Sequence, residues 1–151
     1  MNKLHIEVLR DNINSLNLSA EWVRYSYEQA QKIGIKTSYS AGELEKLEVL
    51  SSRYARTTDI LVNKVLRSID TVEFEDIGTI IDIMNRAAKR GIVQSVEILH
   101  ALKDLRNNIV HEYHVTELAG FFTDVVKHTP LLLEIIENLN NYCTRYLESE
   151  A

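Results

Sequence analysis

The chain has 151 residues, of which 45% are hydrophobic, and a formal net charge of −5. This length and composition exclude a disordered chain and predict one domain, residues 1–151, that buries about two-thirds of its unfolded surface. The acidic balance argues against a general nucleic-acid binder, and no apolar run approaches the roughly 20 residues that cross a bilayer. Because charged residues also appear too early for a signal-peptide core, we expect a cytoplasmic protein with no membrane contact.

Apolar residues recur at intervals of three and four, and the chain contains a single proline and five glycines. This pattern predicts an all-α fold, an antiparallel helical bundle of about five to six helices. A first helix is predicted from the stripe Ile6, Leu9, Ile13 and Leu16. A second is predicted to be capped by Ser19 and stopped by Gly34, with an apolar stripe of Trp22, Val23, Tyr27, Ala30 and Ile33.

A long third helix is predicted after the polar connection 35–42. Ser40 and Glu43 have the spacing of a capping box, in which each residue satisfies a backbone N–H of the other. The core stripe of the helix reads Leu44, Leu47, Leu50, Tyr54, Leu61, Val65 and Ile69.

The second half of the chain has two further stripes of helical spacing. The first predicts a helix over 74–90, with Gly91 as its C-cap and Ile77, Ile80, Ile81, Met84 and Ala88 toward the core. Ser95 is predicted to cap the next, which presents Ile98 or Leu99, Leu102, Leu105 and Ile109 to the core.

The last segment, 116–146, is apolar at helical spacing but contains Pro130. Proline lacks the backbone N–H that a helix interior uses, so we expect either a kink or a new helix capped by Thr129. Cys143 has no second cysteine with which to form an internal disulfide, and we expect it to fill the core.

Basic residues are concentrated in two stretches of this acidic chain. Between Arg53 and Arg67 four basic residues accompany Asp59 alone, and between Arg86 and Arg106 five accompany two acidic ones. These stretches could form a basic cleft on an acidic body. The alternative is that they are solvated helix faces.

Four chemically useful side chains lie within eight positions: Arg106, Asn107, His111 and Tyr113. Arginine can hold a phosphate with two parallel hydrogen bonds, and histidine is the side chain best suited to move a proton near pH 7. On a regular helix, however, Arg106 and His111 lie about 140° apart. Either the helix ends or distorts near Asn108, or two chains pair so that each contributes to a shared cleft. The simpler alternative is that Arg106 bridges an acidic neighbour such as Asp104 and His111 closes a helix end.

The pattern R-N-x-x-x-H-x-Y after an apolar helical stretch resembles the signature of HEPN-domain proteins, most closely the HepT-like toxins. The resemblance is specific over residues 95–113 and only architectural elsewhere. It implies a homodimeric, metal-independent ribonuclease with Arg106 and His111 as catalytic residues. His111 would deprotonate the ribose 2′-hydroxyl and Arg106 would stabilise the phosphoryl charge, leaving a 2′,3′-cyclic phosphate. Asn107 would orient the phosphate or the imidazole.

The resemblance also implies a protein partner. HepT-like toxins are silenced by minimal nucleotidyltransferase (MNT) antitoxins, which transfer AMP to the motif tyrosine, here Tyr113. The alternative function is a non-catalytic helical partner of a nucleotidyltransferase, in which the same motif binds a nucleotide or the enzyme and cleaves nothing.

We expect no cofactor and no metal site. Glu97 and His100 have the spacing of one di-iron ligand pair, but the sequence contains no second Glu-x-x-His. His111 and His114 have no third ligand at zinc spacing. Phosphate-binding glycine-rich motifs do not occur in the sequence either.

Overall fold

The structure is a computed structural model, and it describes residues 2–76, 78–111 and 118–148. The described residues confirm the all-α prediction and contain no strand. The helical segments, in chain order, are α1 (Lys3–Ile33), α2 (Ala41–Asp59), the π-helical η1 (Ile60–Leu66), α3 (Arg67–Val72), α4 (Ile80–Lys89), α5 (Val96–His111) and α6 (Leu118–Leu147). Segments α2, η1 and α3 follow one another without a break, so the described residues form five helical rods.

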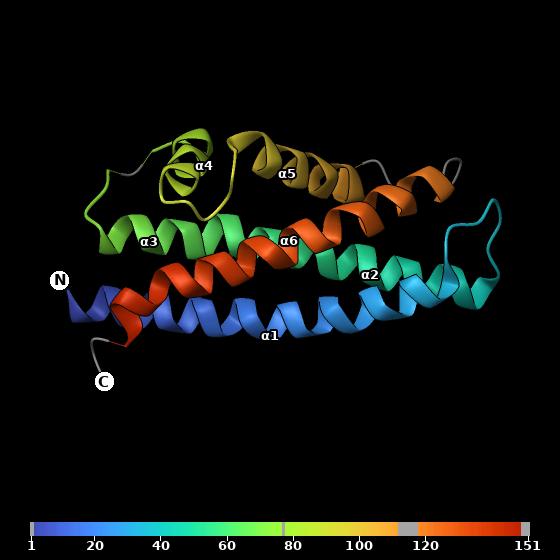
Figure 1. The fold of residues 1–151 in the computed structure, drawn as a ribbon, viewed down its shortest axis with the longest axis horizontal. Helices are drawn as coiled ribbons and strands as arrows, with labels where there is room; N and C mark the ends of the chain where they lie inside the picture. Colours follow the sequence, from blue (N-terminus) through green and yellow to red (C-terminus); the bar gives the residue numbers. More distant parts are fainter. Residues whose placement is uncertain (1, 77, 112–117, 149–151) are drawn as a thin grey trace.

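Three long rods run side by side along the molecule (Figure 1). The α2–η1–α3 rod returns antiparallel to α1, and α6 packs against both α1 and α2. The short α4 lies beside η1, and α5 lies beside the α2 end of the second rod. The second half of α5 therefore lies along the second half of α2, although the two are far apart in the sequence.

The first two predicted helices are one helix. Asn2 caps α1 with its side chain, and the helix continues unbroken to the predicted stop at Gly34, where φ is +77°. Ser19 lies inside this helix, so its predicted capping role is wrong. Its hydroxyl instead pairs with that of Thr57 on α2. Serine tolerates a helix interior when its hydroxyl finds such a partner.

The predicted third helix begins as expected, with both hydrogen bonds of the Ser40–Glu43 capping box formed. It reaches Val72 through η1, a π-helical stretch that was not predicted. The apolar stripe from Leu47 to Ile69 is buried as predicted, and Val62 and Leu66 are buried beside it.

The fourth predicted helix is shorter than expected. Its start is set by a capping box between Thr79 and Asp82, and Gly91 follows its end with a positive φ. Met84 is buried as predicted, and Ile80 and Ala88 are partly buried against the core. The prediction is wrong for Ile81, which is exposed, whereas Ile83 and Ala87 are buried. Ile77 lies outside the described residues.

The last helix, α6, is continuous through Pro130, so the prediction of a new helix at this position is wrong. Thr129 is buried and donates its hydroxyl proton to the carbonyl of Val125 at 2.7 Å rather than capping a helix. Cys143 is fully buried, as predicted.

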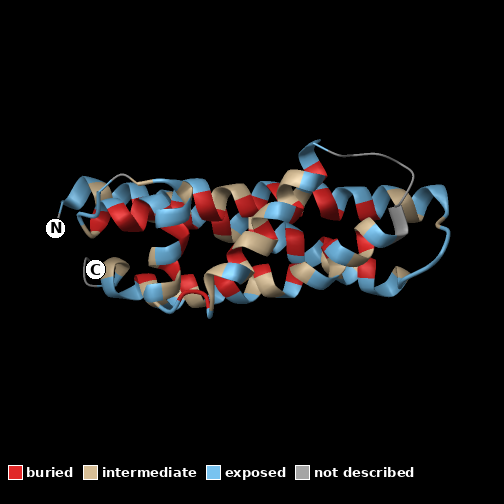
Figure 2. Ribbon diagram, turned by 90° about the horizontal axis from the view of Figure 1, so that it is seen from above, coloured by how far each residue is buried: buried red, intermediate tan, exposed pale blue. Residues whose placement is uncertain are grey.

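The core lies along the facing sides of the rods, where Figure 2 shows the buried residues. From α5 it receives Leu99, Leu102, Leu105 and Ile109. Tyr54 is the largest side chain in this core, and its hydroxyl donates to the carbonyl of Leu102. This bond and the apolar contacts fix α5 against α2. None of the helices in the described part of the chain has the length and apolarity needed to cross a membrane.

Candidate functional site

The motif arginine lies at the junction of α5 and α2. Arg106 points toward Asp59, the last residue of α2, and its Nη2 donates to Oδ2 at 2.9 Å. Its Nε lies 2.6 Å from Oδ1, an ion-pair contact without hydrogen-bond alignment. Asp59 therefore takes the side edge of the guanidinium with both carboxylate oxygens. The pairing of Arg106 with Asp104 considered from the sequence is not formed.

The neighbouring asparagine also orients this arginine. Asn107 accepts a hydrogen bond on Oδ1 from Nη1 of Arg106 at 3.2 Å. Arg106 is thus held on two sides, by Asp59 across the helix interface and by Asn107 on its own helix. Asn107 therefore orients the guanidinium of Arg106 and makes no hydrogen bond with the imidazole of His111 among the described residues.

These contacts do not use all the hydrogen-bond donors of the guanidinium. A guanidinium has five N–H groups in a planar fork, and Asp59 and Asn107 occupy those on one side each. One N–H of Nη1 and one of Nη2 have no acceptor among the described residues. N–H groups on neighbouring guanidinium nitrogens can bind two oxygens of a phosphate.

An open depression of about 590 Å³ adjoins the Asp59 carboxylate. Both helices line it, α2 with Glu48, Ser51, Ser52, Ala55, Arg56 and Asp59 and α5 with Ile109 and Val110. Val110 is half exposed although it is a large apolar residue. The lining combines two carboxylates, one arginine and an uncovered apolar side chain.

The motif histidine lies at the end of α5. Helix α5 continues without a break to His111, so it neither ends nor distorts at Asn108. Because the helix is regular, the separation of about 140° between Arg106 and His111 holds. His111 is exposed, and no hydrogen bond or ion pair joins it to Arg106. One chain therefore does not bring these two side chains together, and Tyr113 and His114 lie outside the described residues.

Asp59 is the site residue that sequence reasoning missed. Its one signal was its isolation, since it is the single acidic residue in the basic stretch from Arg53 to Arg67. The pairing itself spans 47 positions and depends on how α2 and α5 pack. No local pattern could have predicted it.

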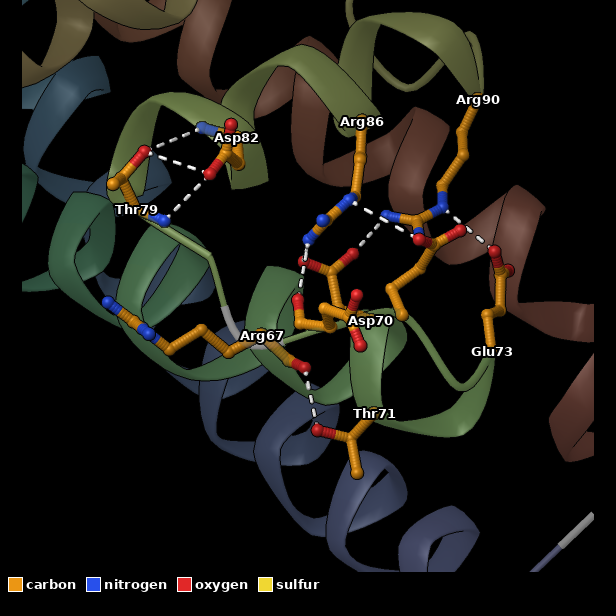
Figure 3. Close-up of polar contacts among 10 residues, drawn as sticks. Arg67, Asp70, Thr71, Glu73, Thr79, Asp82, Arg86 and Arg90 are labelled. Atoms are coloured by element: carbon orange, nitrogen blue, oxygen red, sulfur yellow. Dashed lines mark hydrogen bonds and ion pairs between the residues drawn. The ribbon is translucent and has the colours of Figure 1, made fainter.

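Two arginines of the second basic stretch, Arg86 and Arg90, are used in ion pairs. Arg86 and Arg90 both contact Asp70, at 3.0 and 2.7 Å, and Arg90 also binds Glu73 at 3.0 Å (Figure 3). Asp70 and the Arg90 side chain are less than a tenth exposed. These arginines join α3 to α4 as largely buried ion pairs. They form neither the basic cleft nor the solvated helix face considered from the sequence.

Cys143 has the properties of a core residue rather than a nucleophile. Burial, together with the nearby negative charge of Glu73, raises the pKa of its thiol to about 12. The thiolate is the reactive form of cysteine, so this side chain is inert at neutral pH. Within the described ranges, no three His, Cys, Asp or Glu side chains gather as a metal site would require.

Comparisons of the chain with models of protein families, with curated proteins and with solved structures gave no match.

Proposed function

We propose that this protein is a metal-independent endoribonuclease of the HepT-like class that acts as a homodimer. The observation that carries the proposal is the guanidinium of Arg106. It is held by Asp59 and Asn107, keeps N–H groups that have no acceptor among the described residues, and lies on the same helix as His111. A preorganised cation with free N–H donors is suited to the charge that develops on a phosphoryl group.

In the proposed reaction His111 accepts the proton of a ribose 2′-hydroxyl. The resulting oxygen attacks the adjacent phosphorus, and the bond from phosphorus to the 5′-oxygen breaks. The leaving oxygen takes a proton from water or from a protonated histidine, and the other product ends in a 2′,3′-cyclic phosphate. Arg106 binds the phosphoryl oxygens throughout, and Asp59 keeps the guanidinium in place.

The geometry of α5 supports the proposal of a homodimer. Arg106 and His111 point in directions about 140° apart on a regular helix. A second chain placed against the end of α5 would bring its own His111 toward Arg106 of the first. The half-exposed Val110 lies four residues after Arg106 and so on the same face of α5, where it supplies apolar surface for such a contact.

We further propose regulation by a nucleotidyltransferase partner, which would transfer AMP to Tyr113. This rests on the sequence resemblance and on the nearness of Tyr113 to His111 along the chain. AMP at this position would add a phosphate that competes for Arg106 and a base that fills space beside it.

The deciding experiment is cleavage of an RNA pool by the purified protein in EDTA, with intact mass used to confirm an unmodified chain. Cleavage products with 2′,3′-cyclic ends are expected. Arg106→Ala and His111→Ala should abolish cleavage and relieve toxicity on expression, and Arg106→Lys should rescue poorly because lysine lacks the fork.

Matched controls are available in the chain. Arg67→Ala removes an exposed arginine on α3, and His128→Ala removes a partly buried histidine on α6. Both should cleave like the wild type. Cleavage retained by His111→Ala would refute the mechanism. RNA left intact, with AMP bound in an Arg106-dependent way, would favour the alternative, a non-catalytic partner of a nucleotidyltransferase.

A further inference from the structure

A row of aromatic and cationic side chains extends from the candidate site across α2 to α1. We define it as the α1–α2 track, formed by Trp22, Tyr25, Arg53 and Arg56. Trp22 and Tyr25 are 53% and 55% exposed, although the apolar pattern of α1 assigns Trp22 to the core. Their rings meet edge to face with centroids 6.4 Å apart. Exposed aromatic pairs of this kind are more typical of binding surfaces than of free surface.

Arg53 is fixed beside this aromatic pair. Its guanidinium carbon lies 5.0 Å from the centre of the Trp22 ring, and its Nη1 donates to Ser26 Oγ at 2.7 Å and to the Trp22 carbonyl at 3.3 Å. These contacts use Nη1 and leave Nη2 and Nε without an acceptor among the described residues. The cation and the ring are thus presented together in one fixed arrangement.

Arg56 connects this surface to the candidate site. An open depression of about 410 Å³ lies between α1 and α2, lined by Ser15, Leu18, Trp22, Arg53, Arg56 and Ile60, with Ser19. This lining carries two arginines and no carboxylate. Arg56 also lines the depression beside Asp59, so one exposed side chain borders both hollows. From Arg53 to Asp59 the track advances about 9 Å along α2.

We propose that the α1–α2 track binds the single-stranded RNA substrate, with bases stacked on Trp22 and Tyr25 and phosphates on Arg53 and Arg56. The strand would then continue past Asp59 to Arg106. Alternating aromatic faces and cations are the common means of binding unpaired strands, because every base has a face to stack and every phosphate a charge. This inference rests on the proposed function for its ligand, but its test does not depend on cleavage.

The chain contains a single tryptophan, so the emission of Trp22 reports directly on the track. The probe is a 2′-O-methyl RNA of about ten nucleotides, a length within the usual site size. It lacks the 2′-hydroxyl needed for cleavage, so binding is read whether or not the protein is a nuclease. We expect saturable quenching of Trp22, with a duplex of the same sequence competing poorly because its bases are already stacked.

Variants separate stacking from charge, with the probe labelled so that binding is read by anisotropy. Trp22→Ala should weaken binding by about tenfold and leave its salt dependence unchanged. Arg56→Ala should weaken binding and also lower the slope of log K against log salt by about 0.7, the value for one phosphate contact on a single strand. Phe74→Ala and Arg67→Ala, an exposed aromatic and an exposed arginine outside the track, should bind like the wild type.

The outcomes distinguish this inference from the proposed function. Binding through the track without cleavage of ordinary RNA would uphold the inference and refute the nuclease. Cleavage with a KM that Trp22→Ala and Arg56→Ala leave unchanged would uphold the nuclease and overturn the inference. Trp22 emission that responds to protein concentration or to a nucleotidyltransferase, and not to the probe, would also overturn it and assign the surface to a protein contact.

Discussion

At the scale of single residues, the geometry of one arginine carries the functional argument. To bind a phosphate, the guanidinium of Arg106 must be held in one orientation. Both carboxylate oxygens of Asp59 contact the guanidinium and hold it in that orientation. Asp59 partly neutralises the cation in the free protein. Asp59 offsets this loss of charge by fixing the orientation of the guanidinium, because a cation already held in position need not be ordered during the reaction.

Asp59→Asn should therefore reduce cleavage by about a hundredfold, the usual effect of a small misplacement at a reacting centre. The amide cannot accept on both atoms, so the side edge of Arg106 would lose one contact. The Asp59 side chain is 36% exposed, so its loss should change the melting temperature little. Steady-state cleavage and thermal melting of the same preparation test this. Cleavage at the wild-type rate would show that Asp59 does not position Arg106.

Tyr113→Phe tests the proposed regulation. The phenol has no role in the proposed cleavage, so the variant should cleave RNA normally and resist silencing by a nucleotidyltransferase partner. Intact mass after co-expression, followed by peptide mapping, should find one AMP on the wild type at Tyr113 and none on the variant. Silencing of the variant as complete as that of the wild type would instead indicate occlusion by the partner protein.

At the scale of elements, a polar cluster fastens three helices at one end of the bundle. Glu73, just after α3, accepts hydrogen bonds from Tyr142 and Tyr146 of α6 and pairs with Arg90 of α4. Burial of Glu73 opposes its charge. The two phenol hydrogen bonds and the charge of Arg90 outweigh this, so the pKa of Glu73 lies below its usual value. Burial and the bonds to this carboxylate raise the pKa of Tyr142 and of Tyr146.

The lowered pKa of Glu73 makes the stability of the fold depend on pH. A carboxyl whose pKa is lower in the folded state stabilises the fold above its unfolded pKa, which is about 4.3 for glutamate. That stability is lost as the pH falls through the lower, folded pKa. We therefore expect the melting temperature to fall below about pH 4, with part of the decline due to Glu73.

Glu73→Gln should lower the free energy of unfolding at pH 7 by about 2 kcal/mol, through weakened hydrogen bonds to a charged group. The variant should also show a smaller fall of the melting temperature between neutral pH and pH values below about 4. Glu75→Gln is the matched control, because Glu75 is 46% exposed and its contact with Arg86 is 3.6 Å long. Its effect should be well under about 1 kcal/mol. Equal losses for the two variants would show that the cluster adds nothing beyond surface charge.

At the scale of the whole molecule, the proposed site is incomplete in one chain. Arg106 lies toward α2, whereas His111 is exposed at the end of the same helix. A regular helix cannot turn both into one narrow pocket. The proposed chemistry thus requires a second copy, and Val110 is the half-exposed apolar residue between the two.

Light scattering should accordingly give about twice the chain mass of 17.4 kDa. Val110→Glu should shift the protein toward monomer and reduce cleavage in proportion, because it places a charge on the proposed contact. Ile81→Glu, at an exposed apolar position on α4, is the control and should remain dimeric. A monomer that cleaves RNA at tens of micromolar would eliminate the shared site.

Sequence alone determined the features that depend on residues within about one helical turn. The periodicity of the stripes predicted the all-α fold, and Ser40 with Glu43 predicted one helix start. Gly34 and Gly91 marked two ends, since each adopts a positive φ that glycine accepts without strain. These signals suffice because a helix forms its hydrogen bonds between residues four apart.

Only the tertiary structure decided which side chains meet across helices. It joined the first two predicted helices into one long α1, in which Ser19 pairs with Thr57 of α2. It also exposed Trp22, which the apolar pattern had placed in the core. It also placed Asp59 against Arg106, across 47 positions. The physical reason is that a helix's apolar stripe requires burial without specifying the partner. The partner is set by how the helical rods pack, and this packing depends on the apolar contacts of all the helices together.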